Sequence, residues 1–124
     1  MTPSDFKSSL AGKTPPDGLR LPLVALWWAG KDDWHKAHEI VANGEGSDCA
    51  RVHAHLHRAE GDLSNARYWY QQARRPPASG DLTTEWTAMV AALLRLLQAR
   101  GVYNLINSYA FSRIELGQLA KGMG

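Results

Sequence analysis

Cysteine is almost absent from this chain: Cys49 is the only one in 124 residues, so no disulfide can form within it. A dominant charge is lacking too, because 14 basic and 12 acidic residues leave a net charge of +2 and little attraction for a phosphate backbone. The longest apolar run, residues 88–94, is far shorter than the roughly 20 residues that a membrane-spanning helix needs. We therefore expect a soluble protein with neither nucleic acid nor a membrane as partner.

Signals for secretion and catalysis are also missing. The N-terminus shows no apolar run behind a basic start, and together with the single cysteine this favours a reducing, cytoplasmic setting. No phosphate-binding glycine motif occurs. Cys49 could carry a reactive thiol near a helix start, but no oxyanion donor or orienting group accompanies it. We predict a non-enzymatic protein without a cofactor.

Helical spacing of apolar residues dominates most of what is present. Residues 1–20 are rich in proline, glycine and serine and poor in apolar anchors, which predicts a flexible N-terminal arm. The segment 21–77 predicts two helical hairpins, and residues 81–121 predict two further helices separated at Gly101 that cap the open end of the hairpins. No segment has the alternation of a strand, so the predicted class is all-α.

An internal repeat supports the two hairpins. Residues 33–37 and 62–66 superimpose at an offset of 29 residues, and Ala25 and Ala54 match at the same offset. The second copy resembles a tetratricopeptide repeat, as found in short bacterial helical-repeat proteins. The resemblance is carried, in that family's order, by Ala54, Gly61, Asp62, Leu63, Ala66, Tyr70, Ala73 and Pro76.

This resemblance implies a fold and a mode of action. The fold would be a short right-handed α-α superhelix of two hairpins with C-terminal capping helices. In the family the first helix of each hairpin lines a concave groove, which would place Arg51, His55 and Arg58 opposite Leu26. Basic and imidazole donors beside apolar surface suit an acidic or C-terminal peptide segment. We therefore predict a scaffold that binds a peptide or protein partner in this groove.

Two alternatives come from other residues. His53 and His57 are four apart, so on a helix they share a face as zinc-binding pairs do, and His38 or Glu60 could be a third ligand. In the repeat register, however, His53 and His57 fall at inward positions where hydrogen-bonded histidines between helices are the plainer interpretation. A small metal-binding protein using His38, His53 and His57 is the first alternative. A structural protein that self-associates as a homo-oligomer through the C-terminal helix is the second.

Overall fold

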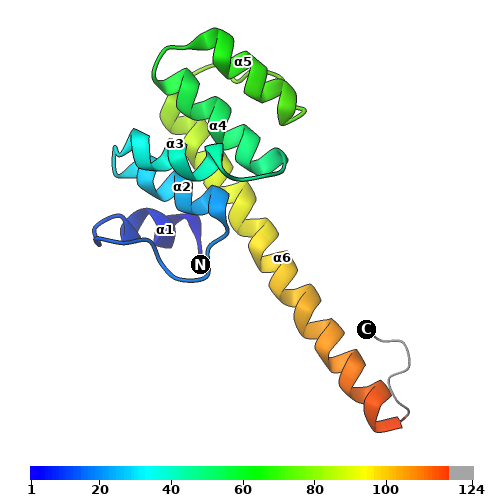
Figure 1. Ribbon diagram of the computed structural model, residues 1–124. Helices are drawn as coiled ribbons and strands as arrows, with labels where there is room; N and C mark the ends of the chain where they lie inside the picture. Colours follow the sequence, from blue (N-terminus) through cyan, green and yellow to red (C-terminus); the bar gives the residue numbers. More distant parts are fainter. Residues whose placement is uncertain (118–124) are drawn as a thin grey trace. The chain divides into compact units, whose positions relative to one another are not determined.

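The computed structural model describes residues 1–117, and their side chains as far as residue 99. Every regular element in that part of the chain is an α-helix, which confirms the all-α class (Figure 1). None of the described helices combines the length with the apolar character that crossing a membrane requires. The chain divides into two units between Leu94 and Arg95, within the last helix. The helices are α1 (Pro3–Ser9), α2 (Leu21–Gly30), α3 (Trp34–Ala42), α4 (Ser47–Ala59), α5 (Leu63–Gln72) and α6 (Leu82–Gly117).

The same turn closes two successive hairpins. Asp32 and Asp33 join α2 to α3, and Gly61 and Asp62 join α4 to α5. Asp32 and Gly61 both have positive φ, 63° and 88°, a conformation that glycine adopts freely and aspartate only at a steric cost. The aspartate that follows each of them caps the next helix by accepting a hydrogen bond from the backbone N–H three residues further on. At these turns the sequence repeat is therefore a structural repeat.

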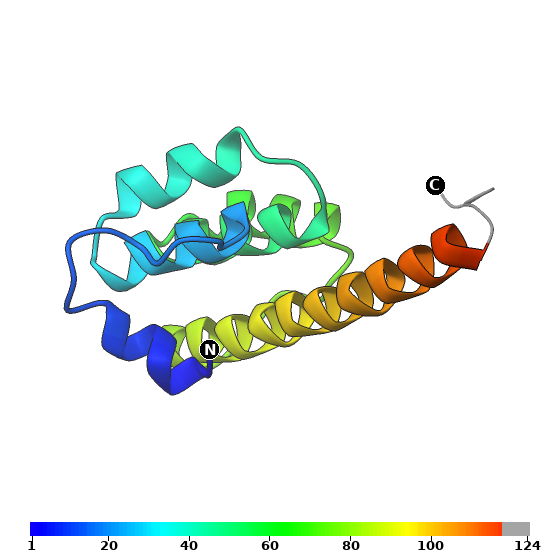
Figure 2. The same ribbon diagram turned by 90° about the horizontal axis from the view of Figure 1, so that it is seen from below.

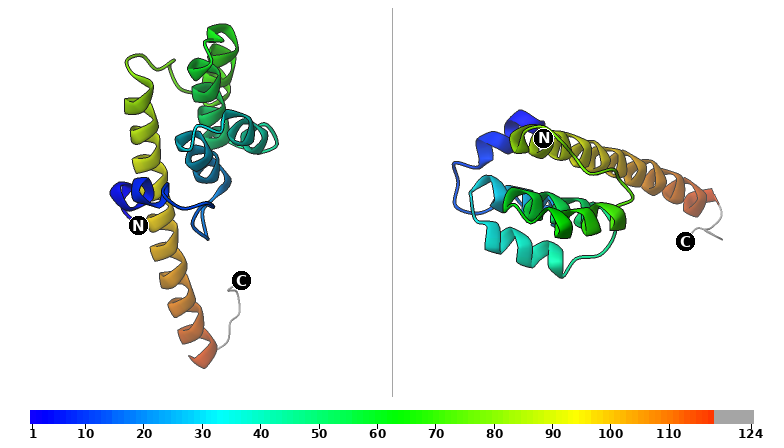
Figure 3. Two further views of the ribbon diagram at one scale, coloured as in Figure 1. Left: turned by 90° about the vertical axis from the view of Figure 1, so that its left-hand side faces the viewer. Right: turned by 90° about the horizontal axis from the view of Figure 1, so that it is seen from above.

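Within the first unit, α2 lies between α3 on one side and α1 with the first part of α6 on the other (Figure 2; Figure 3). Fully buried alanines on α2 and α4 allow close helix packing, and larger apolar side chains fill the space beside them. The most buried side chains of α2, α4 and α6 are Leu23, Ala25, Leu26, Trp27, Val52, Ala54, Leu56, Met89 and Val90.

The first twenty residues are not the flexible arm that their composition predicted. Residues 3–9 form α1, which begins with a capping box between Thr2 and Asp5. Phe6 is fully buried, and its ring centroid lies 5.8 Å from that of Trp86. The prediction was wrong because it rested on the many prolines and glycines and gave no weight to a single aromatic residue. Burial of that one ring is enough to anchor the segment.

Gly101 does not divide the C-terminal segment as predicted. In place of two helices over 81–121, α6 runs unbroken from Leu82 to Gly117. A glycine inside a helix costs only about 1 kcal/mol relative to alanine, and no proline follows to remove a backbone donor. Residues 118–121, and the side chains of the predicted self-association surface from Gly101 onward, lie outside the described part.

Candidate metal centre

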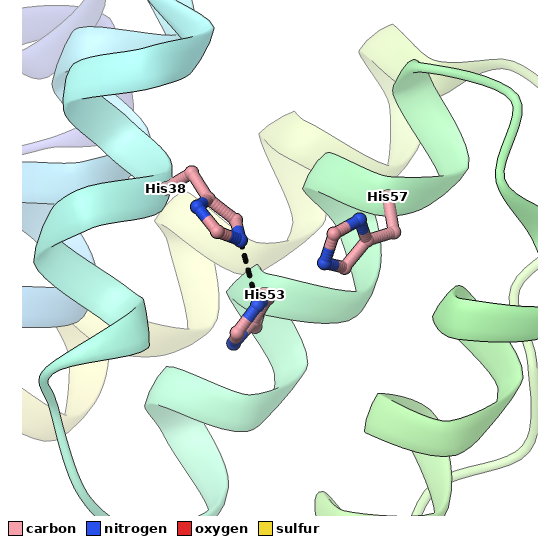
Figure 4. A group of neighbouring side chains, drawn as sticks. All are labelled: His38, His53 and His57. Atoms are coloured by element: carbon pink, nitrogen blue, oxygen red, sulfur yellow. Dashed lines mark hydrogen bonds between the residues drawn. The ribbon is translucent and has the colours of Figure 1, made fainter.

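Three histidines from two helices meet in one place, and we call His38, His53 and His57 the histidine cluster. His53 and His57 are one turn apart on α4, so both rings leave the same face of that helix. His38 comes from α3, which packs against α4. Figure 4 shows the three rings turned toward one another. The three residues that the sequence named as alternative metal ligands are therefore neighbours in space.

The spacing of the ring nitrogens suits a shared ion. Each histidine offers a nitrogen within 4.8 Å of the other two. His38 Nε2 and His53 Nε2 are 3.0 Å apart and share a hydrogen bond (Figure 4). Two nitrogens bound tetrahedrally to one zinc ion at 2.0–2.1 Å would lie about 3.3 Å apart. A shift of a few tenths of an ångström would therefore exchange this hydrogen bond for two metal bonds.

Glu60 fixes the orientation of the third ring. His57 Nδ1 lies 2.7 Å from Glu60 Oε2, so the carboxylate accepts the Nδ1 proton. Nε2 of the same ring is then the free lone pair, and in Figure 4 one ring nitrogen of His57 faces the other two histidines. Metal-bound histidines typically donate their second nitrogen to such a carboxylate, which raises their basicity. The sequence suggested Glu60 as a possible third ligand, whereas in the structure its carboxylate contacts His57.

Two tryptophans enclose the histidine cluster. Trp34 stacks on His38 with ring centroids 4.7 Å apart, and Trp69 stacks on His53 at 4.0 Å. Trp34 is itself held in place because its Nε1 donates to the backbone carbonyl of Leu56 at 2.7 Å. These contacts limit rotation of the His38 and His53 rings, so the cluster is preorganised before any ion arrives.

His38 and His53 favour the uncharged form of imidazole. Burial, reinforced by His38 and His57, lowers the pKa of His53 to about 4, and burial likewise lowers the pKa of His38. His53 Nδ1 is buried and has no hydrogen-bond partner among the described side chains, so Nε2 is the atom of that ring that takes part in the cluster. A neutral imidazole has a lone pair to offer a metal ion. Because His38 and His53 share an Nε2–Nε2 hydrogen bond, one of these two nitrogens carries a proton, which metal binding would displace.

Imidazole nitrogens suit zinc, copper(II) and nickel(II) better than calcium or magnesium, which prefer oxygen ligands. A second group that could hold a metal ion consists of His57, Glu60 and Asp62. Both carboxylates already have partners, because Glu60 binds His57 and Asp62 caps α5. The nitrogen ligands of the histidine cluster therefore form the better candidate site.

The predicted peptide groove is not open at its predicted residues. Leu26 is fully buried and His55 is 4% exposed. Glu85 of α6 accepts hydrogen bonds from His55 Nδ1 at 2.7 Å and from Arg58 Nη1 at 2.9 Å. Arg51 is half-buried. The groove assignment is thus corrected: the first part of α6 occupies the position expected for a peptide, and Glu85 supplies the carboxylate.

Cys49 does not form a reactive site. The thiol is buried, and burial raises its pKa above the ordinary value, which disfavours the thiolate that nucleophilic chemistry needs.

No family model, curated protein or solved structure matches the chain. What the protein binds is therefore inferred from the geometry of its own residues.

Proposed function

We propose that this protein binds one divalent transition-metal ion through His38, His53 and His57. The observation that carries the proposal is the convergence of three histidine nitrogens within 4.8 Å, with His57 oriented by Glu60. Zinc, copper(II) or nickel(II) fits this all-nitrogen set. The ion would connect α3 to α4 and so tie the first hairpin to the second.

Such a connection would stabilise the fold. An ion that binds only the folded chain adds about 2.7 kcal/mol to the free energy of unfolding when its free concentration is 100 times the dissociation constant. The cluster draws on helices from both hairpins, so the unfolded chain lacks the arrangement that binds the ion. A structural or storage role follows from this geometry more directly than a catalytic one.

Titration of the protein, purified without a polyhistidine tag, with Zn²⁺ in a calorimeter tests the proposal. We expect one ion per chain. His38→Ala should weaken binding by more than the roughly 10- to 100-fold cost of losing an outer hydrogen-bond partner. His35→Ala is the matched control, because His35 lies on the same helix but is exposed and outside the cluster.

Three results would contradict the metal proposal. The wild-type protein could fail to bind Zn²⁺ stoichiometrically, or both variants could lose the same affinity. Unchanged binding in His38→Ala would place the ion instead at His57, Glu60 and Asp62.

A second proposal keeps the predicted role as a scaffold of tetratricopeptide-like, right-handed hairpins. The matched turns of the two hairpins support it, but a partner would have to bind outside the occupied groove. Leu63 and Tyr68 on α5 are 56% and 51% exposed and offer apolar surface. Affinity capture from the protein's own cell extract should then yield a partner that Tyr68→Ala loses. Capture of the same proteins by the wild type and by Tyr68→Ala would count against binding at Tyr68.

A further inference from the structure

A cavity of about 400 Å³ lies among α1, α2, α4 and the start of α6. Its wall is mostly apolar and includes the side chains of Leu56, Leu82 and Trp86. Lys7 and Asp32 also line it, and their opposite charges leave little net field for an ionic ligand. The volume is within the range of small-molecule sites. No member of the histidine cluster lines this cavity, but the two share Trp34, which lines the cavity and stacks on His38.

One histidine connects the cavity to a buried carboxylate. His55 lines the cavity, and its Nδ1 donates to Glu85 Oε1 at 2.7 Å. Burial by itself raises the pKa of Glu85, but hydrogen bonds from His55, Tyr70 and Arg58 outweigh burial and hold it below the ordinary value. Glu85 is thus ionised, and it fixes both the orientation of the His55 ring and the nitrogen that carries the proton.

The second ring nitrogen of His55 is left for a ligand. Among the side chains described, Nε2 of His55 has no hydrogen bond, yet the only fully enclosed polar side-chain atom without a partner is His53 Nδ1. His55 Nε2 therefore keeps some access to its surroundings, and His55 lines the cavity. With Nδ1 bonded to Glu85, Nε2 is the ring nitrogen of His55 that is left to form a hydrogen bond with a ligand.

We propose that the cavity binds a small, uncharged aromatic molecule whose hydroxyl group forms a hydrogen bond with His55 Nε2. The apolar wall accommodates the ring, Trp86 offers an aromatic contact, and the opposite charges of Lys7 and Asp32 favour no ion. Trp86 is held in place because its Nε1 donates to the backbone carbonyl of Leu26 at 2.8 Å. The Glu85 carboxylate holds the His55 ring in one orientation, so the hydroxyl meets a fixed partner at Nε2.

Titrations with 4-methylphenol, toluene and 4-methylbenzoate, followed by protein NMR, test this site. We expect 4-methylphenol to bind about fivefold more tightly than toluene, as one net hydrogen bond allows, and more tightly than the benzoate. In His55→Asn the shorter amide keeps a donor for Glu85 but removes Nε2. The advantage of 4-methylphenol should vanish there, while toluene binding stays within about twofold of wild type.

Several outcomes would overturn the cavity proposal. In the wild type these are a failure of all three probes to bind, equal affinity for 4-methylphenol and toluene, or tighter binding of 4-methylbenzoate than of 4-methylphenol. In His55→Asn it is 4-methylphenol still binding more tightly than toluene. If circular dichroism shows that this variant does not fold, Ala59→Phe replaces it, because Ala59 lines the cavity but is exposed. Phenylalanine there should weaken both neutral probes about fivefold or more. Unchanged affinity would place their binding elsewhere.

Discussion

Replacing Glu60 with alanine should weaken zinc binding about 10- to 100-fold while leaving the helical fold intact. Glu60 forms a 2.7 Å hydrogen bond to His57 Nδ1, and its charge also acts on His38. Its side chain is 39% exposed, so losing this bond costs less than about 1 kcal/mol of folding stability. A zinc-bound His57, by contrast, would lose both its orientation and the carboxylate that raises its basicity. The loss in binding free energy would be about 1.4–2.7 kcal/mol.

Competition with a chromophoric chelator measures this loss. Glu60→Gln should lie between wild type and Glu60→Ala, because the amide oxygen still accepts from Nδ1 but carries no charge. Circular dichroism and urea unfolding of the metal-free variants check the fold. Equal zinc affinity in all three chains would refute the positioning role of Glu60. A complete loss in Glu60→Gln would instead identify the carboxylate as a ligand.

Three further predictions concern the fold. Burial beside other histidines lowers the pKa of His53 to about 4. Between pH 6.5 and pH 4 the unfolded chain therefore binds a proton at His53 that the folded chain does not. The free energy of unfolding should fall by roughly 3 kcal/mol as the pH is lowered over that range. In urea titrations His53→Phe should flatten that fall, and an unchanged pH dependence would contradict this. Phe6→Ala should cost about 3–5 kcal/mol of unfolding free energy, where a flexible arm would show no effect. Glu85→Ala, which removes the acceptor shared by His55 and Arg58, should cost about 3–5 kcal/mol, and a loss below 1 kcal/mol would show that the buried network is unimportant.

The hairpins could be predicted because their signals are local. Asp33 and Asp62 cap helices through hydrogen bonds to residues three positions away. Gly61 indicates a turn because glycine adopts a positive φ without steric cost. Such features depend on a few neighbouring residues. The anchoring of α1 could not be found in this way, because the burial of Phe6 against Trp86 joins positions 80 residues apart. The local signals for that helix are the capping pair Thr2 and Asp5 and the proline at its first position.

The candidate sites were predictable to the same extent. Spacing alone put His53 and His57 on one helix face, and the hairpin repeat brought α3 close enough for His38 to be considered. Whether Glu60 would bind an ion or orient His57 depends on rotamers, which spacing does not determine. The groove failed as a prediction for a related reason. Nothing local to Glu85 shows that it bonds to His55 from a helix 30 residues later, which fills the space meant for a peptide.

X-ray absorption at the zinc edge of the loaded, tag-free protein tests the metal proposal most directly. The histidine cluster predicts one zinc per chain whose first shell contains three imidazole nitrogens at about 2.0–2.1 Å and no sulfur. A shell dominated by carboxylate oxygens, one with fewer than two imidazoles, or a chain that retains no zinc would contradict it.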